Sequence, residues 1–239
     1  MTQQGHQLKI QYGLFTKKNV TVPADRLQGV LEHQSYLRRL FGYTSIHFYI
    51  TSDIDSTSSE PSDKNGRIVI LPFIKRTEAY NVIQLLVTEM QFNFVQPGMS
   101  LKAFHRHFLI PSIILMIAGL IGWYFWSIWS FVIVGAIITL LIIAAVLYTR
   151  FGGYSVNNEE LIVQKASLLN IKRYYFRNNK ALGMKITQHP LLEKNHLANF
   201  KFIITKGNDN KVIGLKYNQV SNVQQLKKWY MRSDTHEIL

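Results

Sequence analysis

Hydrophobic and polar residues are mixed along most of the chain, but one long segment is apolar throughout. From Phe108 to Tyr148, 41 consecutive residues include no Asp, Glu, Lys, Arg or His. One straight helix of that length would extend roughly 60 Å, about twice the ~30 Å hydrocarbon core of a bilayer. The segment therefore predicts a transmembrane hairpin with spans at 108–126 and 128–148. Pro111 is expected in the first turn of its helix, where a missing N–H costs little.

The two ends of this segment differ in composition, which predicts its orientation. Around the uncharged turn lie aromatic residues that favour the headgroup level, Trp123, Tyr124, Trp126 and Trp129. The opposite ends carry Lys102, His105, Arg106, His107 and Arg150. Because positive residues stay on the cytoplasmic side, both soluble parts and both termini are expected in the cytoplasm. The alternative is a core hairpin of a soluble protein, which is rare for helices that are apolar on every side.

The two parts that flank the hairpin show the same order of predicted elements. Short strand-like runs come first, followed by an alternating, half-buried strand at 45–51 or 200–205 and then by one further strand. Each part ends with an amphipathic helix, the first at 77–90 and the second starting at a capping box of Ser221 and Gln224. Several strands followed by one helix predict an α+β protein with small open barrels or sandwiches, each closed at its end or seam by its helix.

An internal repeat supports this organisation. At an offset of 154 residues the two parts pair identical residues: Gly29 with Gly183, Gln34 with Gln188, Leu37 with Leu191, Phe48 with Phe202, Ile50 with Ile204 and Thr51 with Thr205. The chain is therefore predicted to contain two copies of one domain. The predicted boundaries are 1–95 for the first copy, 96–107 for a juxtamembrane linker, 108–148 for the hairpin, 149–233 for the second copy and 234–239 for a tail.

Charge adds a possible membrane surface to this picture. The net charge is +13, with 12 basic against 8 acidic residues before the hairpin and 15 against 6 after it. A basic domain below an anionic leaflet gains roughly 1 kcal/mol per Lys or Arg that reaches the surface. An equal alternative is a solvated basic face. The chain contains no cysteine, which excludes disulfides, thiolate metal sites and cysteine nucleophiles.

One stretch of the first copy resembles a known family. From Val22 to Thr51 the chain resembles the signature of bacterial pleckstrin-homology-like (PH-like) domains of the YdbS/YdbT type. The matching residues are Pro23, Arg26, Leu27, Gln28, Gln34, Leu37, Arg38, Arg39, Phe41 and Gly42. The second copy keeps Gln188 and Leu191 but has Lys180 in place of the Arg and Leu182 in place of a Gln, so it resembles a diverged member.

The order of domain, hairpin and domain is similar to the carboxy-terminal part of YdbT-type proteins. Met1 aligns with Tyr154, so the hairpin that precedes such a domain in the family is expected to be missing, and a natural truncation, a misplaced start and an engineered fragment of a YdbT-type protein are equal explanations. The resemblance implies a non-enzymatic binding or assembly module of the bacterial cell envelope, with members tied to tolerance of membrane-active antimicrobial compounds. A YdbS-type protein or a second copy of the chain is the implied protein partner. The alternative function is an accessory subunit of a membrane export or channel complex.

Two groups of residues are the candidate binding sites. The predicted interaction surface of the first copy consists of Arg26, Gln28, Gln34, Arg38 and Arg39. For Gln28 and Gln34 a structural role, bonding strand and turn backbone, is an equal alternative. The predicted contact with anionic lipid in the second copy consists of Lys172, Arg173, Arg177, Lys180 and Lys185, interleaved with aromatic residues. Nucleic acid is a poorer partner for charge that is spread over strands and tied to a bilayer.

Catalytic, metal and cofactor residues are not predicted. The sequence has no phosphate-binding Gly-rich loop, and the spans lack the ionisable residues of ion pathways, so anchoring is the expected role of the hairpin. Ala118 with Gly122 and Gly135 with Thr139 predict close helix packing. Gly152 and its neighbour Gly153 predict a flexible joint after the hairpin, and the Ser-rich segment 53–66 predicts a mobile loop.

Overall fold

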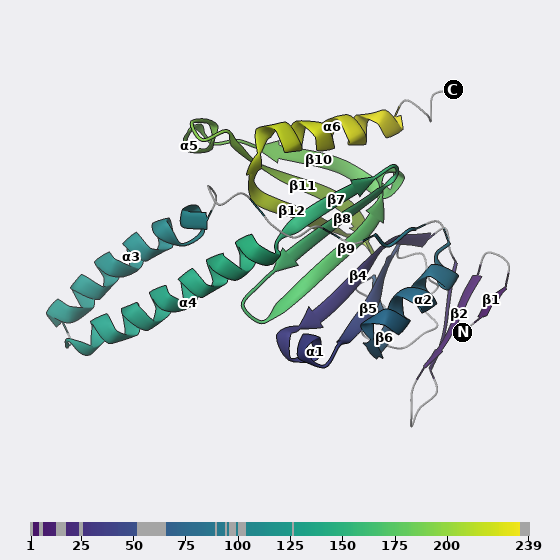
Figure 1. Ribbon diagram of the computed structural model, residues 1–239, viewed down its shortest axis with the longest axis horizontal. Helices are drawn as coiled ribbons and strands as arrows, with labels where there is room; N and C mark the ends of the chain where they lie inside the picture. The colour runs from purple at the N-terminus through teal and green to yellow at the C-terminus, as the bar shows by residue number, and fades with distance from the viewer. Residues whose placement is uncertain are drawn as a thin grey trace.

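The computed structural model contains three β-sheets and a projecting pair of long helices (Figure 1). It describes residues 2–4, 7–12, 18–23, 26–51, 66–88, 90–93, 95, 99, 104–125 and 127–234. The predicted loop at 53–66 lies outside these residues except for Gly66. An α+β fold with two long apolar helices is thus confirmed.

The largest sheet contains strands from both halves of the chain. Its order is β6-β5-β4-β9-β8-β7, and every neighbouring pair is antiparallel. Its strands are β4 (Leu27–Ser35), β5 (Tyr43–Ile50), β6 (Arg67–Lys75), β7 (Gly153–Asn157), β8 (Glu160–Ala166) and β9 (Asn170–Arg177). Strands β4 and β9 join the halves, with Val30 opposite Tyr175 and Ser35 opposite Asn170. We refer to it below as the shared sheet.

Two smaller sheets complete the β-structure. One consists of β1 (Thr2–Gln4), β2 (Gln7–Tyr12) and β3 (Lys18–Pro23), and the other of β10 (Ala181–Thr187), β11 (Leu197–Lys206) and β12 (Asp209–Gln219). The helices are α1 (Tyr36–Leu40), α2 (Arg76–Leu86), α3 (Phe104–Phe125), α4 (Trp129–Phe151), α5 (Pro190–Glu193) and α6 (Val220–Asp234), with a short 3-10 turn at Asn178–Lys180. The element order of the first half recurs in the second, so that α1 corresponds to α5 and α2 to α6.

Each face of the shared sheet is covered by a separate hydrophobic core. In β4, Val30 belongs to the core beneath α2, whereas the next residue, Leu31, belongs to the core between the shared sheet and β10–β12. In β5, Phe48 and Tyr49 divide in the same way. The predicted half-buried strand at 45–51 is therefore wrong, because β5 is buried on both faces.

A closed barrel is not seen in the part of the chain that the structure describes, so the prediction of an open barrel or a sandwich is not contradicted. Strand β4 has β5 and β9 as its neighbours, so its second edge pairs with the other half of the chain. The domain boundaries drawn from the sequence stay a prediction, because one sheet takes strands from both proposed domains.

A buried ion pair lies where the halves meet. Glu32 of β4 is directly opposite Arg173 of β9 in the register, and its Oε2 lies 2.9 Å from the Arg173 Nη1. Arg76 approaches the other carboxylate oxygen at 3.1 Å. Tyr80 and Thr44 donate hydrogen bonds to the same carboxylate at 2.7 and 3.1 Å. Burial alone would raise the pKa of Glu32, but the two guanidinium groups and these hydrogen bonds outweigh it and hold the pKa below its ordinary value.

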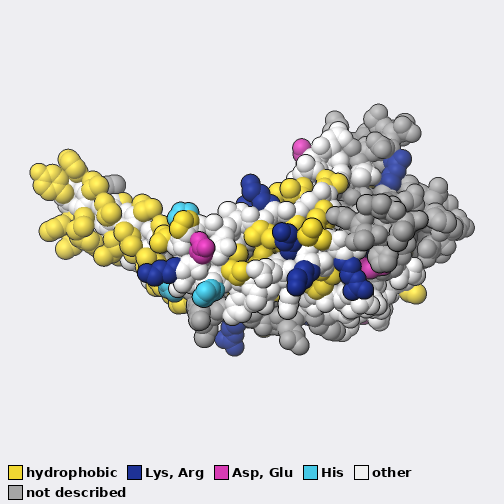
Figure 2. All heavy atoms as spheres, turned by 90° about the horizontal axis from the view of Figure 1, so that it is seen from above, with side chains coloured by type: hydrophobic (Ala, Val, Ile, Leu, Met, Phe, Trp, Pro, Cys, Tyr) yellow, Lys and Arg dark blue, Asp and Glu magenta, His cyan; other side chains and the backbone are white. Residues whose placement is uncertain are grey.

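The two long helices form a hairpin that projects from the sheets as an apolar arm (Figure 2). Both are long and apolar enough to cross a membrane. Only 6% of the most apolar 18-residue stretch of α3, and 11% of that of α4, is buried. A core hairpin of a soluble protein would be mostly buried, so that alternative does not fit. Gly119 and Gly122 allow the close approach, since an added Cβ would lie 3.1 Å from Val134 and 3.0 Å from Ser130. Ala118 is exposed and takes no part in this contact, so its role in packing against other helices stays a prediction.

Three smaller predictions about helix ends are corrected. Helix α3 begins at Phe104, so Pro111 lies inside it and removes one backbone hydrogen bond. Helix α6 begins at Val220, so Ser221 lies in its first turn and is not the N-cap. Gly152 caps α4 by donating its N–H to the Tyr148 carbonyl at 2.8 Å, and an added Cβ would lie 2.3 Å from that oxygen. The junction after the hairpin is therefore closely packed and is not a flexible joint.

Replacing Glu32 should test the ion pair. Glu32→Gln leaves the buried Arg173 and the half-buried Arg76 without their counter-charge, so we expect a loss of about 3–5 kcal/mol in unfolding free energy. Because the pKa of Glu32 is lowered, this stabilisation is present at neutral pH and is lost as the pH falls through the folded-state value. Glu159→Gln is the control, since Glu159 pairs with Arg177 but is exposed, and it should cost less than about 1 kcal/mol. Thermal unfolding of the full chain in mild detergent measures both, and equal losses would contradict the role given to Glu32.

Candidate functional site

The predicted interaction surface of the first copy is divided between the interior and the surface. Gln34 is 2% exposed, and its side-chain amide donates to the Tyr43 carbonyl at 3.0 Å. Gln28 is buried in the same strand, whereas Arg26 is partly exposed at its start. For the two glutamines the structure thus favours the structural alternative. Their burial excludes them from a surface that a partner contacts directly.

The two arginines of this set lie on α1, beside the base of the hairpin. Arg38 donates to the Pro72 carbonyl at 3.4 Å and lies over the ring of Phe73. Arg39 lies over the ring of Phe151, the last residue of α4, at 4.6 Å from the ring centre. These contacts bring α1 next to the end of a long apolar helix.

The predicted lipid-contact residues of the second copy do not form one surface. Arg173 is 6% exposed and pairs with Glu32, so its assignment as a lipid contact is wrong: its charge is used between the halves. Arg177 pairs with Glu159, Lys180 ends the 3-10 turn, and Lys185 is exposed on β10. Lys172 faces a cavity. The lining of that cavity includes four lysines.

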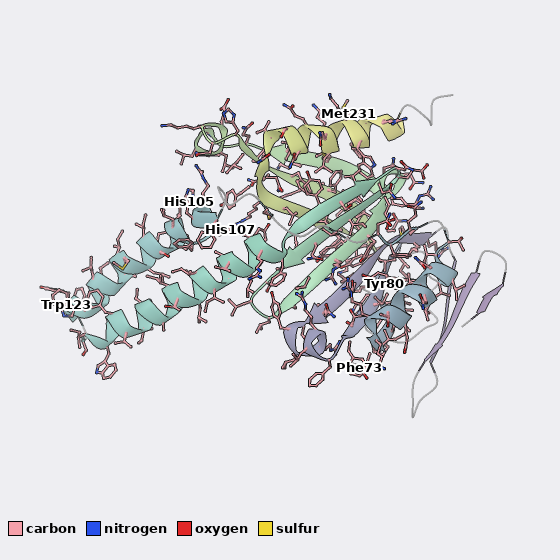
Figure 3. The ribbon with its side chains drawn as sticks, in the orientation of Figure 1. Phe73, Tyr80, His105, His107, Trp123 and Met231 are labelled. Atoms are coloured by element: carbon pink, nitrogen blue, oxygen red, sulfur yellow. The ribbon has the colours of Figure 1, made fainter. Side chains whose placement is uncertain are left out.

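The cavity has a volume of about 420 Å³ and lies at the base of the hairpin. Four strands supply its lysines: Lys165 from β8, Lys172 from β9, Lys201 from β11 and Lys216 from β12. Helices α3 and α4 supply His107 and Tyr148, and Ser167, Asn170 and Tyr174 add polar groups. Figure 3 shows His107 at the end of α3 nearest the sheets, opposite Trp123 at the far tip. We call this site the lysine cavity.

Strand register explains why two of the lysines, Lys165 and Lys172, lie side by side. Leu161 and Val163 of β8 point into the core between the sheets, and Lys165 continues the same side of the strand. On β9, Lys172 continues the side that buries Tyr174 and is directly opposite Lys165. Like charges that face each other across two strands are destabilising.

The electrostatics of the cavity are one-sided. Two causes together lower the pKa of Lys165 to about 8. The larger is burial, and the smaller is the positive charge of the neighbouring lysines Lys211, Lys201, Lys216 and Lys172. No Asp or Glu lines the cavity in the described ranges. Lys165, Lys201 and Lys216 were not predicted from the sequence. A signal was available for Lys165, because it ends the core-facing row of Leu161 and Val163, whereas Lys201 and Lys216 are exposed residues that alternate with core positions. The arrangement suits the binding of an anion.

A second feature lies on the side of the body from which the hairpin projects. Figure 1 shows α1, the turn between β8 and β9, and α5 along this side. Its exposed apolar side chains are Leu37, Leu40, Phe41, Leu168, Leu169 and Leu191. We call these six residues the hairpin-side face. Leu37 and Leu191 are equivalent in the internal repeat, and they are 74% and 60% exposed.

Contacts with the hairpin hold this face in place. The Tyr36 ring packs against Phe151 at the end of α4, and the Tyr36 hydroxyl donates to the Ser167 carbonyl at 3.1 Å. On the other side, Arg106 of α3 donates to the carbonyl of Leu191 at 2.7 Å. The exposed leucines of both halves thus lie next to the bases of the two apolar helices.

A family model described as bacterial PH domain matches residues 2–89 and 101–234. The chain belongs to the bacterial PH domain family. No curated protein and no solved structure matches the chain. Within this PH-domain protein, the first matched segment corresponds to the first half and the second to the hairpin with the second half. PH-like domains are generally non-catalytic binding modules, which agrees with a site that is suited to an anion.

Metal ligands do not gather in the part of this PH-domain protein that the structure covers: no group of three or more His, Asp or Glu side chains is placed to hold an ion.

Removing the Lys165 charge should stabilise the protein. The pKa shift from 10.5 to about 8 predicts that Lys165→Met raises the unfolding free energy at pH 7 by roughly 1–3 kcal/mol, after allowance for solvent screening. Because the folded-state pKa is the lower one, wild-type stability rises as the pH increases from about 8 to 10.5, and the difference closes there. Thermal unfolding at several pH values measures this. Lys185→Met, at an exposed site, should change little, and a destabilised Lys165→Met would contradict the reasoning.

Proposed function

We propose that this protein is a membrane-anchored, non-enzymatic PH-like binding module whose two halves rest on the surface of the bilayer that its hairpin crosses. The family match supports the binding module, and the two exposed apolar helices support the anchor. Basic residues flank the base of the hairpin, so the surface in question is that of the cytoplasmic leaflet.

The observation that carries this proposal is the hairpin-side face. Six large apolar side chains are exposed on α1 with its C-cap, on the β8–β9 turn and on α5, the elements beside the base of the hairpin, and exposed apolar groups of this kind are typical of an interaction site. Leu37 and Leu191 occupy equivalent positions of the repeat, and both lie beside the hairpin. A bilayer would meet both at once, since the same two helices fix its position.

The charges beside the face also fit a membrane surface. Arg38 and Arg39 lie on α1, and Arg106 contacts α5. Arginine side chains at this level attract anionic headgroups, while leucine and phenylalanine side chains enter the boundary of the acyl chains. Apolar and basic groups are thus combined as in surface-bound membrane segments.

The finer identity is part of this proposal. Resemblance of residues 22–51 to YdbS/YdbT-type domains supports a protein of the bacterial cell envelope with a role in tolerance of membrane-active antimicrobial compounds. A YdbS-type protein or a second copy of the chain stays the predicted protein partner. An accessory subunit of an export or channel complex stays the alternative, and co-purification with a protein of many spans would favour it.

Single cysteines can test the position of the bilayer, because the natural sequence contains none. Leu37→Cys and Leu191→Cys, each carrying an environment-sensitive fluorophore, are reconstituted as full chains in vesicles. We expect blue-shifted emission at both positions, and quenching by lipids brominated near the headgroup.

Met231→Cys is the matched control. Met231 is also an exposed apolar residue, but it lies on α6, away from the hairpin (Figure 3). Its label should stay in water and escape quenching. Equal quenching at all three positions, or at none, would contradict the proposal. Reaction of Met231→Cys with a membrane-impermeant maleimide in inverted but not in intact vesicles would support the cytoplasmic orientation.

A further inference from the structure

The lysine cavity has positive charges that no acidic group in the described residues balances. Its four lysines come from four strands, and Lys165 and Lys172 are direct cross-strand neighbours. None of the four side-chain ammonium groups has an ion pair among the described residues. Holding such charges together costs folding free energy, and a bound anion would offset that cost.

The chemistry of the lining indicates which anion fits. Ammonium groups are common phosphate ligands because each offers three hydrogen-bond donors. Ser167 and Asn170 add a hydroxyl and an amide at the rim between β8 and β9. A volume of about 420 Å³ holds a small organic phosphate or a lipid headgroup. A simple halide would leave most of these donors without a partner.

The place of the cavity indicates where the anion comes from. His107 lies in the first turns of α3 and Tyr148 in the last turn of α4, so the lining includes both bases of the hairpin. The Tyr148 hydroxyl accepts the N–H of Lys216 at 3.1 Å, which ties β12 to α4 beside the cavity. In the proposed orientation this is the level of the phosphate groups of the leaflet.

We propose that the lysine cavity binds a phosphate group, supplied by the headgroup of an anionic phospholipid or by a soluble phosphate ester. The lipid source rests on the function proposed above, whereas phosphate binding itself does not. This site differs from the five residues predicted from the sequence, of which it includes Lys172 alone. The hairpin-side face holds the protein against the bilayer, and the lysine cavity selects one chemical group there.

Two probes distinguish the sources with the full chain in a neutral detergent. Thermal unfolding is followed with inorganic phosphate and with chloride at equal ionic strength. Native mass spectrometry follows the retention of phosphatidylglycerol against phosphatidylcholine. We expect stabilisation by phosphate, or preferential retention of phosphatidylglycerol, or both. Stabilisation by phosphate alone assigns a soluble ligand, and retention of phosphatidylglycerol alone assigns the lipid.

The variant Lys165→Gln with Lys172→Gln should weaken the effect by about tenfold or more. It should still fold, because it removes two facing like charges, and thermal unfolding without ligand checks this. A second variant, Lys201→Gln with Lys216→Gln, removes the other two charges from exposed positions and should weaken binding in the same way.

The control is Lys227→Gln with Lys228→Gln, an equal change of charge at exposed positions on α6. It should bind as the wild type does. The proposal is overturned if the wild type responds to neither probe, or if the control loses as much binding as the cavity variants. If the wild type responds to neither probe but shows the expected quenching at Leu37→Cys, the cavity alone is overturned. If it responds to either probe but Leu37→Cys is not quenched, the membrane docking alone is overturned.

Discussion

The buried pair of Glu32 and Arg173 is the constraint on which the arrangement of the two halves depends. A carboxylate with almost no contact with water is tolerated only when cations and hydrogen-bond donors surround it. Here the donors come from β9 of one half and from β5 and α2 of the other. A shift of β4 against β9 by one residue would turn Glu32 away from its partners and would place both charges wrongly. The pair thus helps to hold the two halves together and specifies the register of β4 against β9.

Much of the organisation could be predicted from the sequence, because it depends on local pattern. The hairpin follows from composition alone, and the order of strands and helices follows from periodicity and from the repeat. The pairing of β4 with β9 could not be predicted in this way. Strands that are buried on both faces show no clear alternation, and a single sequence does not show which strand is the neighbour of which. Arg173 was placed on the surface for this reason, since an arginine among aromatic residues has the same pattern whether it meets lipid or a buried carboxylate.

The candidate sites show the same limit. Lys172 was found because it lies in a basic run, whereas Lys165 and Lys201 come from strands that the fold alone brings together. Gln34 matched a family signature, but it bonds the backbone of a turn, so a recurring residue marked architecture and not contact. The internal repeat was more useful than any single residue of it. It made Leu37 and Leu191 equivalent, and the structure places both of them, exposed, beside the hairpin.

Both halves are attached to the hairpin. Helix α1 of the first half packs on the end of α4, whereas the second half is bonded to α3 through α5 and to α4 through β12. The closely packed junction at Gly152 connects α4 directly to the edge strand β7. Neither half can therefore rotate independently of the hairpin. If a thinner or thicker bilayer changes the tilt of the two helices, that change is transmitted as torque to both ends of the folded body.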